Sequence, residues 1–238
     1  MITIADGKCG VWDVHGYPPI FSPKSRDYDQ VIPGRHGEYP FDSDYESRQF
    51  TLRLVSPRTT DKETYRHQLF AMFPLTVIDL VFETLHHYVI LDGQIDCTDL
   101  PYHVDATIPL RMCDPYAYSD EHTQAGGLIE NLGNVECLPI IEIGASTNPS
   151  VTFGSVTLAW TGIVGAGETL IIDCDKKTVK KGTTNRLKDY AGGFPSIPPK
   201  ATEQQSYSVE MGMAWGYGNT VSITSASTIN VRWKDRFI

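Results

Sequence analysis

Gln49-Phe-Thr-Leu-Arg-Leu-Val55 is the stretch from which the fold of this 238-residue chain can be worked out. Its second, fourth and sixth residues are apolar and alternate with Thr51 and Arg53. A period of two is typical of a β-strand that has one buried face and one face in water. The stretch therefore predicts a strand at the centre of the first half of the chain.

The residues that follow predict a single helix at about 61–72. Thr60 and Glu63 have the spacing of a capping box, in which a hydroxyl and a carboxylate each accept from a free backbone N–H at the start of a helix. Apolar side chains then recur at helical spacing, at Tyr65, Leu69, Met72 and Phe73. Pro74 cannot continue the helix, because it has no backbone N–H.

Two further segments of the first half are rich in β-branched and aromatic residues, at 76–82 and 88–91. Asp92-Gly93 follows the second of them and suits a tight hairpin turn. We therefore expect a hairpin that leads into a strand at 94–98.

The second half of the chain predicts a separate β domain. Residues 120–133 are rich in Gly, Asp, His and Gln, and regular patterning resumes only at 138–143, so we place the boundary between domains at 127/128. Strands are predicted, without a convincing helix, at 151–160, 169–173, 178–180, 207–213, 221–224 and 228–237. This pattern is typical of a β-sandwich or a jelly roll, and the whole chain is predicted to be mainly β.

The charges are unevenly distributed. The chain has 20 Lys and Arg against 29 Asp and Glu, a net charge of −9, and residues 1–125 hold 10 basic and 19 acidic residues. An acidic half argues against specific nucleic-acid binding, which depends on Lys and Arg at phosphates. No apolar run approaches the length needed to cross a bilayer, so we expect no membrane insertion. No secretory signal is visible at Met1, so we expect synthesis in a cytoplasm.

Motifs for catalysis or cofactor binding are not found. The five cysteines are widely spread without a C-x-x-C pair, which predicts free and mostly buried thiols. His86-His87 lacks metal-binding spacing, and the acidic residues at 42, 44 and 46 lack the Gly and Glu that a calcium loop needs. We therefore expect no metal, no cofactor and no enzymatic activity.

Aromatic residues of the second half offer one alternative function. Trp160 and Trp215 could stack on a sugar ring if either were exposed on a concave sheet, whereas a place in the core of the sandwich is the simpler interpretation. A carbohydrate-binding module that recognises a cell-wall glycan therefore remains an open alternative.

The order of several motifs resembles one family over nearly the whole chain. In the first half these are Ile32-Pro-Gly-Arg-His-Gly37, the strand ending in Arg53-Leu54, the capped helix, Leu91-Asp-Gly-Gln94 and Met112-Cys-Asp-Pro-Tyr116. In the second half they are Asn131-Leu-Gly-Asn134, Leu138-Pro-Ile-Ile141, Gly167-Glu-Thr-Leu-Ile-Ile-Asp173 and Gly193-Phe-Pro-Ser196. In this order they resemble the distal tail (Dit) proteins of siphophages, although Trp215-Gly-Tyr-Gly-Asn219 departs from the plainer turn expected there.

The resemblance implies a structural protein of the virion tail tip, assembled in the host cytoplasm. It implies an N-terminal β-sandwich or ring domain (1–127) with one α-helix and a galectin-like C-terminal β-sandwich (128–238). It further implies a homo-hexameric ring whose lumen conducts DNA. The partners would be the tail tube protein, the tail-associated hub protein and a receptor-binding protein or a host-surface glycan.

The acidic, turn-rich segment 33–47 has no apolar face of its own. Its charged residues are Arg35, Glu38, Asp42, Asp44 and Glu46. It is a candidate for an inter-subunit arm, as in family members that clasp the next protomer. A plain surface hairpin is the alternative.

Overall fold

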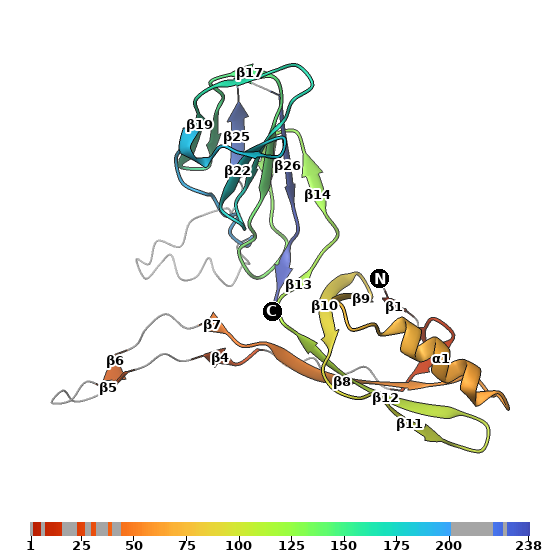
Figure 1. Ribbon diagram of the computed structural model, residues 1–238. Coiled ribbons are helices and arrows are strands. Elements are labelled where there is room, and N and C mark those ends of the chain that lie inside the picture. Colours follow the sequence, from red (N-terminus) through yellow and green to blue (C-terminus); the bar gives the residue numbers. More distant parts are fainter. Residues whose placement is uncertain are drawn as a thin grey trace. The chain divides into compact units, whose positions relative to one another are not determined.

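The computed structural model describes residues 2–5, 8–15, 23–26, 30–31, 38–39, 44–200, 221–225 and 228–238, and Figure 1 shows its elements. The chain divides into two compact units. Unit 1 is Met1–Ala117 together with Ile238, and unit 2 is Tyr118–Phe237. The division comes ten residues before the expected change of domain at residue 128.

The described residues of unit 1 form one helix and short to medium strands. They are β1 (Ile2–Ala5), β2 (Lys8–Cys9), β3 (Trp12–Val14), β4 (Ser25–Arg26), β5 (Gln30–Val31), β6 (Glu38–Tyr39), β7 (Asp44–Tyr45), β8 (Arg48–Val55), α1 (Lys62–Met72), β9 (Ile78–Phe82), β10 (Leu85–Leu91), β11 (Asp96–Asp99) and β12 (Val104–Met112). β13 (Ala117–Tyr118) spans the division between the units.

The main sheet of unit 1 closes on itself. Its strands follow the order β12-β8-β3-β2-β1-β9-β10, and β10 pairs again with β12. Every pairing in this circuit is antiparallel except β1 with β9, which is parallel. The mainly β fold with one helix is thus confirmed, and the sheet of unit 1 forms a barrel.

β8 supplies the side chains that fill the barrel, as its alternating sequence predicts. Phe50, Leu52 and Leu54 are buried, whereas Thr51 and Arg53 are exposed. β12 alternates in the same way and runs antiparallel to β8 from Asp105↔Val55 to Met112↔Arg48. These two strands form the longest ladder of the unit.

The helix lies where the sequence predicts it, but a different residue caps it. Asp61 Oδ1 accepts a hydrogen bond from the backbone N–H of Thr64 at 3.2 Å, and Asp61 Oδ2 accepts from the Thr64 hydroxyl at 2.7 Å. The capping box of Thr60 and Glu63 is therefore wrong, because the cap lies one residue later. Leu69 is the buried residue of the helix. Tyr65, also in the helix, packs edge-on against Trp12 with ring centroids 5.9 Å apart.

The hairpin expected at Asp92-Gly93 is also wrong. β10 and β11 do not pair with each other; they occupy consecutive parts of the same edge of β12, with Leu91↔Leu110 and Asp96↔Thr107 as neighbouring register points. The four residues 92–95 therefore lie opposite only two residues of β12, 108 and 109, which makes a bulge rather than a turn. The real hairpin joins β11 to β12 through residues 100–103, where the Leu100 N–H donates to the His103 carbonyl.

Where it is described, unit 2 consists of short strands and one 3₁₀ turn. They are β14 (His122–Gln124), β15 (Gly127–Ile129), β16 (Ile140–Ile143), β17 (Ser146–Thr147), β18 (Ser150–Phe153), β19 (Val156–Trp160), β20 (Ile163–Val164), β21 (Leu170–Asp173), β22 (Thr178–Lys181), β23 (Thr184–Asn185), η1 (Leu187–Asp189), β24 (Tyr190–Ala191), β25 (Val221–Ser225), β26 (Ile229–Trp233) and β27 (Arg236–Phe237). The strand expected at 151–160 is a hairpin of β18 and β19, and the one expected at 207–213 lies outside the described residues.

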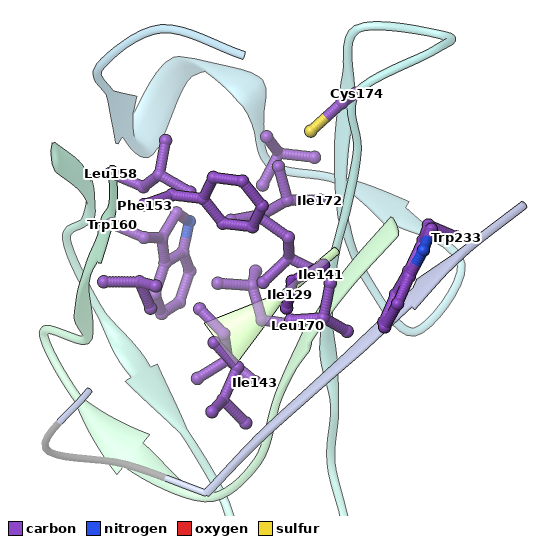
Figure 2. Packing of buried hydrophobic residues seen from close by; sticks show 14 of the residues in the cluster. Ile129, Ile141, Ile143, Phe153, Leu158, Trp160, Leu170, Ile172, Cys174 and Trp233 are labelled. Atoms are coloured by element: carbon purple, nitrogen blue, oxygen red, sulfur yellow. The ribbon is translucent and has the colours of Figure 1, made fainter. Parts of the chain in front are cut away.

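Two sheets of unit 2 share one apolar core. The sheets run β14-β26-β16-β21-β22-β23 and β15-β25-β18-β19-β24. Figure 2 shows side chains of both in one cluster, with Ile141 and Leu170 from the first sheet and Phe153 and Leu158 from the second. The predicted β-sandwich is thus confirmed.

One loop of the sandwich is held by a buried amide. Asn131 is fully buried, its Nδ2 donates to the carbonyls of Val135 and Ile197, and its Oδ1 accepts from the N–H of Gly133. A Cβ at Gly133 would lie 2.1 Å from the Arg236 carbonyl oxygen, so no larger residue fits there. This gives the Asn131-Leu-Gly-Asn134 motif a structural reason.

Candidate functional site

The candidate arm is a two-part antiparallel pairing that precedes β8. β4 pairs with β7 through Ser25↔Tyr45, and β5 pairs with β6 through Val31↔Glu38. The Glu46 N–H donates to the Lys24 carbonyl at 2.8 Å and extends the first pairing toward β8. The two pairings are nested in the chain, since β5 and β6 lie between β4 and β7 in the sequence.

The structure places the five predicted arm residues unevenly. Glu38 lies in β6, Asp44 lies in β7, and Glu46 lies between β7 and β8. Arg35 and Asp42 lie outside the described residues. Glu38 and Asp44 thus lie in the paired strands, while the role of the five residues in a subunit contact stays a prediction.

Polar side chains are buried in the barrel close to the base of this hairpin. Arg48, the first residue of β8, is buried, and among the described residues its Nε and Nη2 have no hydrogen-bond partner. His87 of β10 is 5% exposed and lies edge-on against Phe82, with centroids 5.2 Å apart. Burial, followed by the positive charge of Arg48, lowers the pKa of His87 to about 4. Both side chains occupy positions that face the barrel interior. The apolar pattern of the sequence did not predict them there, because both residues are polar.

Unit 2 contains a groove of about 190 Å³ at one end of its six-stranded sheet. Apolar and aromatic side chains of Leu138, Ile140 and Trp233 contribute to its lining. Six of its seven charged lining residues form ion pairs with one another, namely Arg236–Asp175 at 3.0 Å, Lys176–Asp173 at 3.3 Å and Arg232–Glu121 at 3.3 Å, and Lys234 is the seventh. Because most of these charges are paired within the lining, the groove suits an uncharged polar ligand better than an ion.

Of the two tryptophans proposed for sugar stacking, the structure describes only Trp160. Trp160 is only 5% exposed and packs in the sandwich core, as Figure 2 shows, so its ring is not available to a glycan. A Cβ at Gly162 would lie 2.6 Å from the Trp160 ring, which shows how closely the chain covers it. Trp215 lies outside the described residues.

One Ser, His and Asp constellation lies in unit 2. His122 Nε2 is 3.0 Å from Asp235 Oδ2 and 3.3 Å from the Ser119 hydroxyl oxygen. A hydrolytic triad needs the acid on one ring nitrogen and the nucleophile on the other. Here both contacts fall on the same nitrogen, so the arrangement is a structural contact of β14 with the end of β26.

The cysteines are free, as predicted, and those at 9, 137 and 174 are buried. Burial raises the pKa of Cys9 to about 11 and that of Cys137 and Cys174 to about 12, which makes them poor nucleophiles. Within the described ranges, no three His, Cys, Asp or Glu side chains gather as a metal site would require. Nor does any helix there have the length and apolar character to span a bilayer.

The comparison with solved structures identifies the fold. The chain matches the Dit protein of phage SPP1, described as a paradigm of the hub adsorption apparatus in phages that infect Gram-positive bacteria, with a TM-score of 0.68 and 12% identity. The match covers 98% of this chain and 97% of the SPP1 protein. The fold is that of a phage distal tail protein.

Two further matches come from the baseplate of phage p2. A chain of the p2 baseplate in its activated conformation with strontium matches with a TM-score of 0.45 and 11% identity over 94% of this chain and 90% of that one. A chain of the baseplate in its activated conformation with calcium matches with a TM-score of 0.42 and 12% identity over 97% of this chain and 94% of that one. No protein-family model matches the chain, and no curated protein is significantly similar to it.

Proposed function

We propose that this protein is a structural component of a phage virion, the distal tail hub that joins the tail tube to the baseplate or adsorption apparatus. The observation that carries the proposal is the full-length match to the SPP1 Dit hub protein, which includes the barrel, the helix and the sandwich in the same chain. Only 12% of the aligned residues are identical, so the similarity consists of the shared architecture, which covers 98% of this chain. The protein would act by assembly and not by catalysis.

In this proposal six copies form a closed ring around a channel for DNA. Unit 1 builds the ring, and unit 2 is a galectin-like domain. The tail tube protein, the tail-associated hub protein and a receptor-binding protein are the expected partners. Tails assemble in the host cytoplasm, so the finished protein would be found at the virion tail tip.

The acidic first half gives the proposed channel a physical role. Six copies of residues 1–125 bring a formal charge of about −54 before screening. Carboxylates that line the channel would repel DNA and keep it from binding during passage. Replacing channel-facing carboxylates with amides should slow genome ejection without preventing ring assembly, and unchanged ejection kinetics would contradict this role.

Labelling of virions tests the proposed location. Antibodies against the purified protein, carried on gold particles, should bind at the distal end of the tail in electron micrographs of the phage that encodes this chain. Labelling of the capsid or the tail sides, or absence of the protein from purified particles, would contradict the proposal.

A second candidate function is glycan binding by unit 2. The groove favours this function through its apolar and aromatic lining residues and its paired charges, whereas Trp160 is buried and does not. Binding of host cell-wall oligosaccharides, measured by NMR on the intact protein and lost in Arg232→Ala, would support this function. Unchanged spectra at millimolar sugar would remove it.

A further inference from the structure

One face of the six-stranded sheet of unit 2 points away from the core of the sandwich. Successive side chains of a strand alternate between the two faces of a sheet, and paired residues of neighbouring strands lie on the same face. Ile172 and Val179 are paired and buried in the core. The residues on either side of them in the sequence therefore lie on the opposite face, which we call the outer face.

The outer face carries two neighbouring rows of side chains. The first row crosses four strands and consists of Arg232, Ile140, Asp173 and Thr178. The second row lies two residues further along each strand and consists of Asn230, Glu142, Ile171, Lys180 and Asn185. The first three residues of the first row line the groove, so the groove and Lys180 share one face.

Polar side chains of the outer face hold one another in place. The Asn230 amide donates to Glu142 Oε2 at 3.2 Å, and the Arg232 guanidinium pairs with Glu142 Oε1 at 2.7 Å. Arg232 also pairs with Glu121, which lines the groove. The network presents fixed donors and acceptors, which is the kind of surface that orients the hydroxyl groups of a sugar.

Positive charge is concentrated beside the groove. Residues 176–188 contain six Lys and Arg and no Asp or Glu, although the chain has a net charge of −9. Lys176 lines the groove, and Lys177 follows it in the turn that leads into β22. Lys177 and Lys180 are exposed, and neither forms an ion pair within the described part of the chain. Their charges are therefore available to an anionic ligand.

The composition of the outer face argues against a protein as its ligand. The centre of a protein interface is depleted of charged residues. The outer face instead has Glu142, Arg232 and Asp173 at its centre. In the described part of unit 2 the exposed large apolar side chains lie outside both rows, at Leu128, Leu132, Ile163 and Leu187.

The same carboxylates argue against a nucleic acid. Duplex DNA carries one negative charge per about 1.7 Å of its axis, so its phosphates would lie against Glu142 and Asp173. A glycan with one anionic group per sugar unit avoids this repulsion. Its hydroxyl groups can donate to the carboxylates of the outer face, while the anionic group lies at a lysine.

We propose that the outer face of unit 2 binds an anionic glycan, with the uncharged part of a sugar unit in the groove and a carboxylate or phosphate at Lys177 and Lys180. The groove, at about 190 Å³, has room for about six water molecules, which suits a sugar unit. The inference rests on the glycan-binding function proposed for unit 2 and adds the charge of the ligand and the residues that recognise it. It does not depend on the ring.

Calorimetry with matched oligosaccharides tests the preference for charge. Oligogalacturonate carries one carboxylate per sugar unit, and its methyl ester is the same chain without the charge. The intact protein should bind the charged form about tenfold more tightly, and added salt should reduce the difference. A phosphomannan oligosaccharide, compared with the same mannan without phosphate, tests phosphate as the anionic group. Preference for either charged form over its uncharged counterpart supports the proposal.

Lysine substitutions locate the contact. Lys177→Gln combined with Lys180→Gln should weaken binding of the charged oligosaccharide about tenfold and leave binding of the uncharged one unchanged. Lys188→Gln is the matched control, since it removes an exposed charge of the same stretch that lies in η1, outside the sheet. The control should bind like the wild type.

The outcomes separate this inference from the function on which it rests. Equal affinity for charged and uncharged oligosaccharides, or wild-type affinity of the double variant, would overturn the inference and leave glycan binding in place. Polyglutamate that bound as tightly as oligogalacturonate would also overturn it, because charge alone would then suffice. No binding of any oligosaccharide would contradict the glycan-binding function as well.

Discussion

His87 lies inside the barrel, next to Arg48, and is neutral near pH 7 because its pKa is lowered to about 4. In the unfolded chain a histidine binds its proton near pH 6.5. Between these values the unfolded state binds more protons, so stability falls as the pH drops from 6.5 toward 4 and is fully present above that window. The loss is at most on the order of 3 kcal/mol.

Replacing His87 tests this linkage. The free energy of unfolding of His87→Gln should change less between pH 7 and pH 4 than that of the wild type, as measured by urea denaturation at a series of pH values. Identical pH profiles for the two proteins would show that another group is responsible.

Trp160 decides between a packing role and a binding role. Its ring is buried in the sandwich core, so Trp160→Ala should cost about 3–5 kcal/mol, while Trp160→Phe should cost clearly less. Chemical denaturation followed by circular dichroism measures both. A Trp160→Ala protein of nearly unchanged stability that had lost glycan binding would restore the sugar-stacking hypothesis.

At the scale of elements, the start of α1 allows a comparison of neighbouring residues. Asp61→Ala removes the cap and should destabilise the protein by about 0.5–2 kcal/mol. Thr60→Ala should cost little stability, because among the described residues the helix is capped by Asp61 and not by Thr60. A larger effect at Thr60 than at Asp61, in thermal unfolding, would restore the capping box.

The hairpin formed by β4–β7 can be removed where its strands face each other. Because Ser25 pairs with Tyr45, a short Gly-Ser linker can replace residues 26–44 without stretching the chain. If this hairpin is the inter-subunit arm, the shortened protein should be a folded monomer that no longer forms rings. Rings of normal size, seen by negative-stain microscopy, would make it a plain surface hairpin.

Elements with a regular pattern were the ones that the sequence could predict. β8 alternates over its whole length, and the residues of α1 recur at helical spacing, so both followed from the residues alone. The hairpin predicted at Asp92-Gly93 was wrong because the same dipeptide fits a turn and a bulge. Only the pairing of β10 with β12 decides between them. The exposure of Leu75 could not be predicted either, since burial depends on contacts between distant segments.

At the scale of the whole molecule, the order of motifs predicted the architecture better than any single residue did. Asn131 illustrates this, because a short polar motif turned out to hold a loop through one buried amide. The closure of the barrel could not be read from the sequence, since the parallel β1–β9 pair joins segments about 78 residues apart. The groove of unit 2 was missed for the same reason, because its lining combines residues from separate strands and turns.

The two units of each chain have separate apolar cores. The proposed function is the assembly of whole copies of the chain into a ring. The mass of the purified protein in solution tests that claim most directly. Light scattering at two concentrations, with negative-stain images of the same samples, should show particles of about six times 26.5 kDa with a central hole. A strictly monomeric protein at both concentrations, without ring-shaped particles, would contradict it.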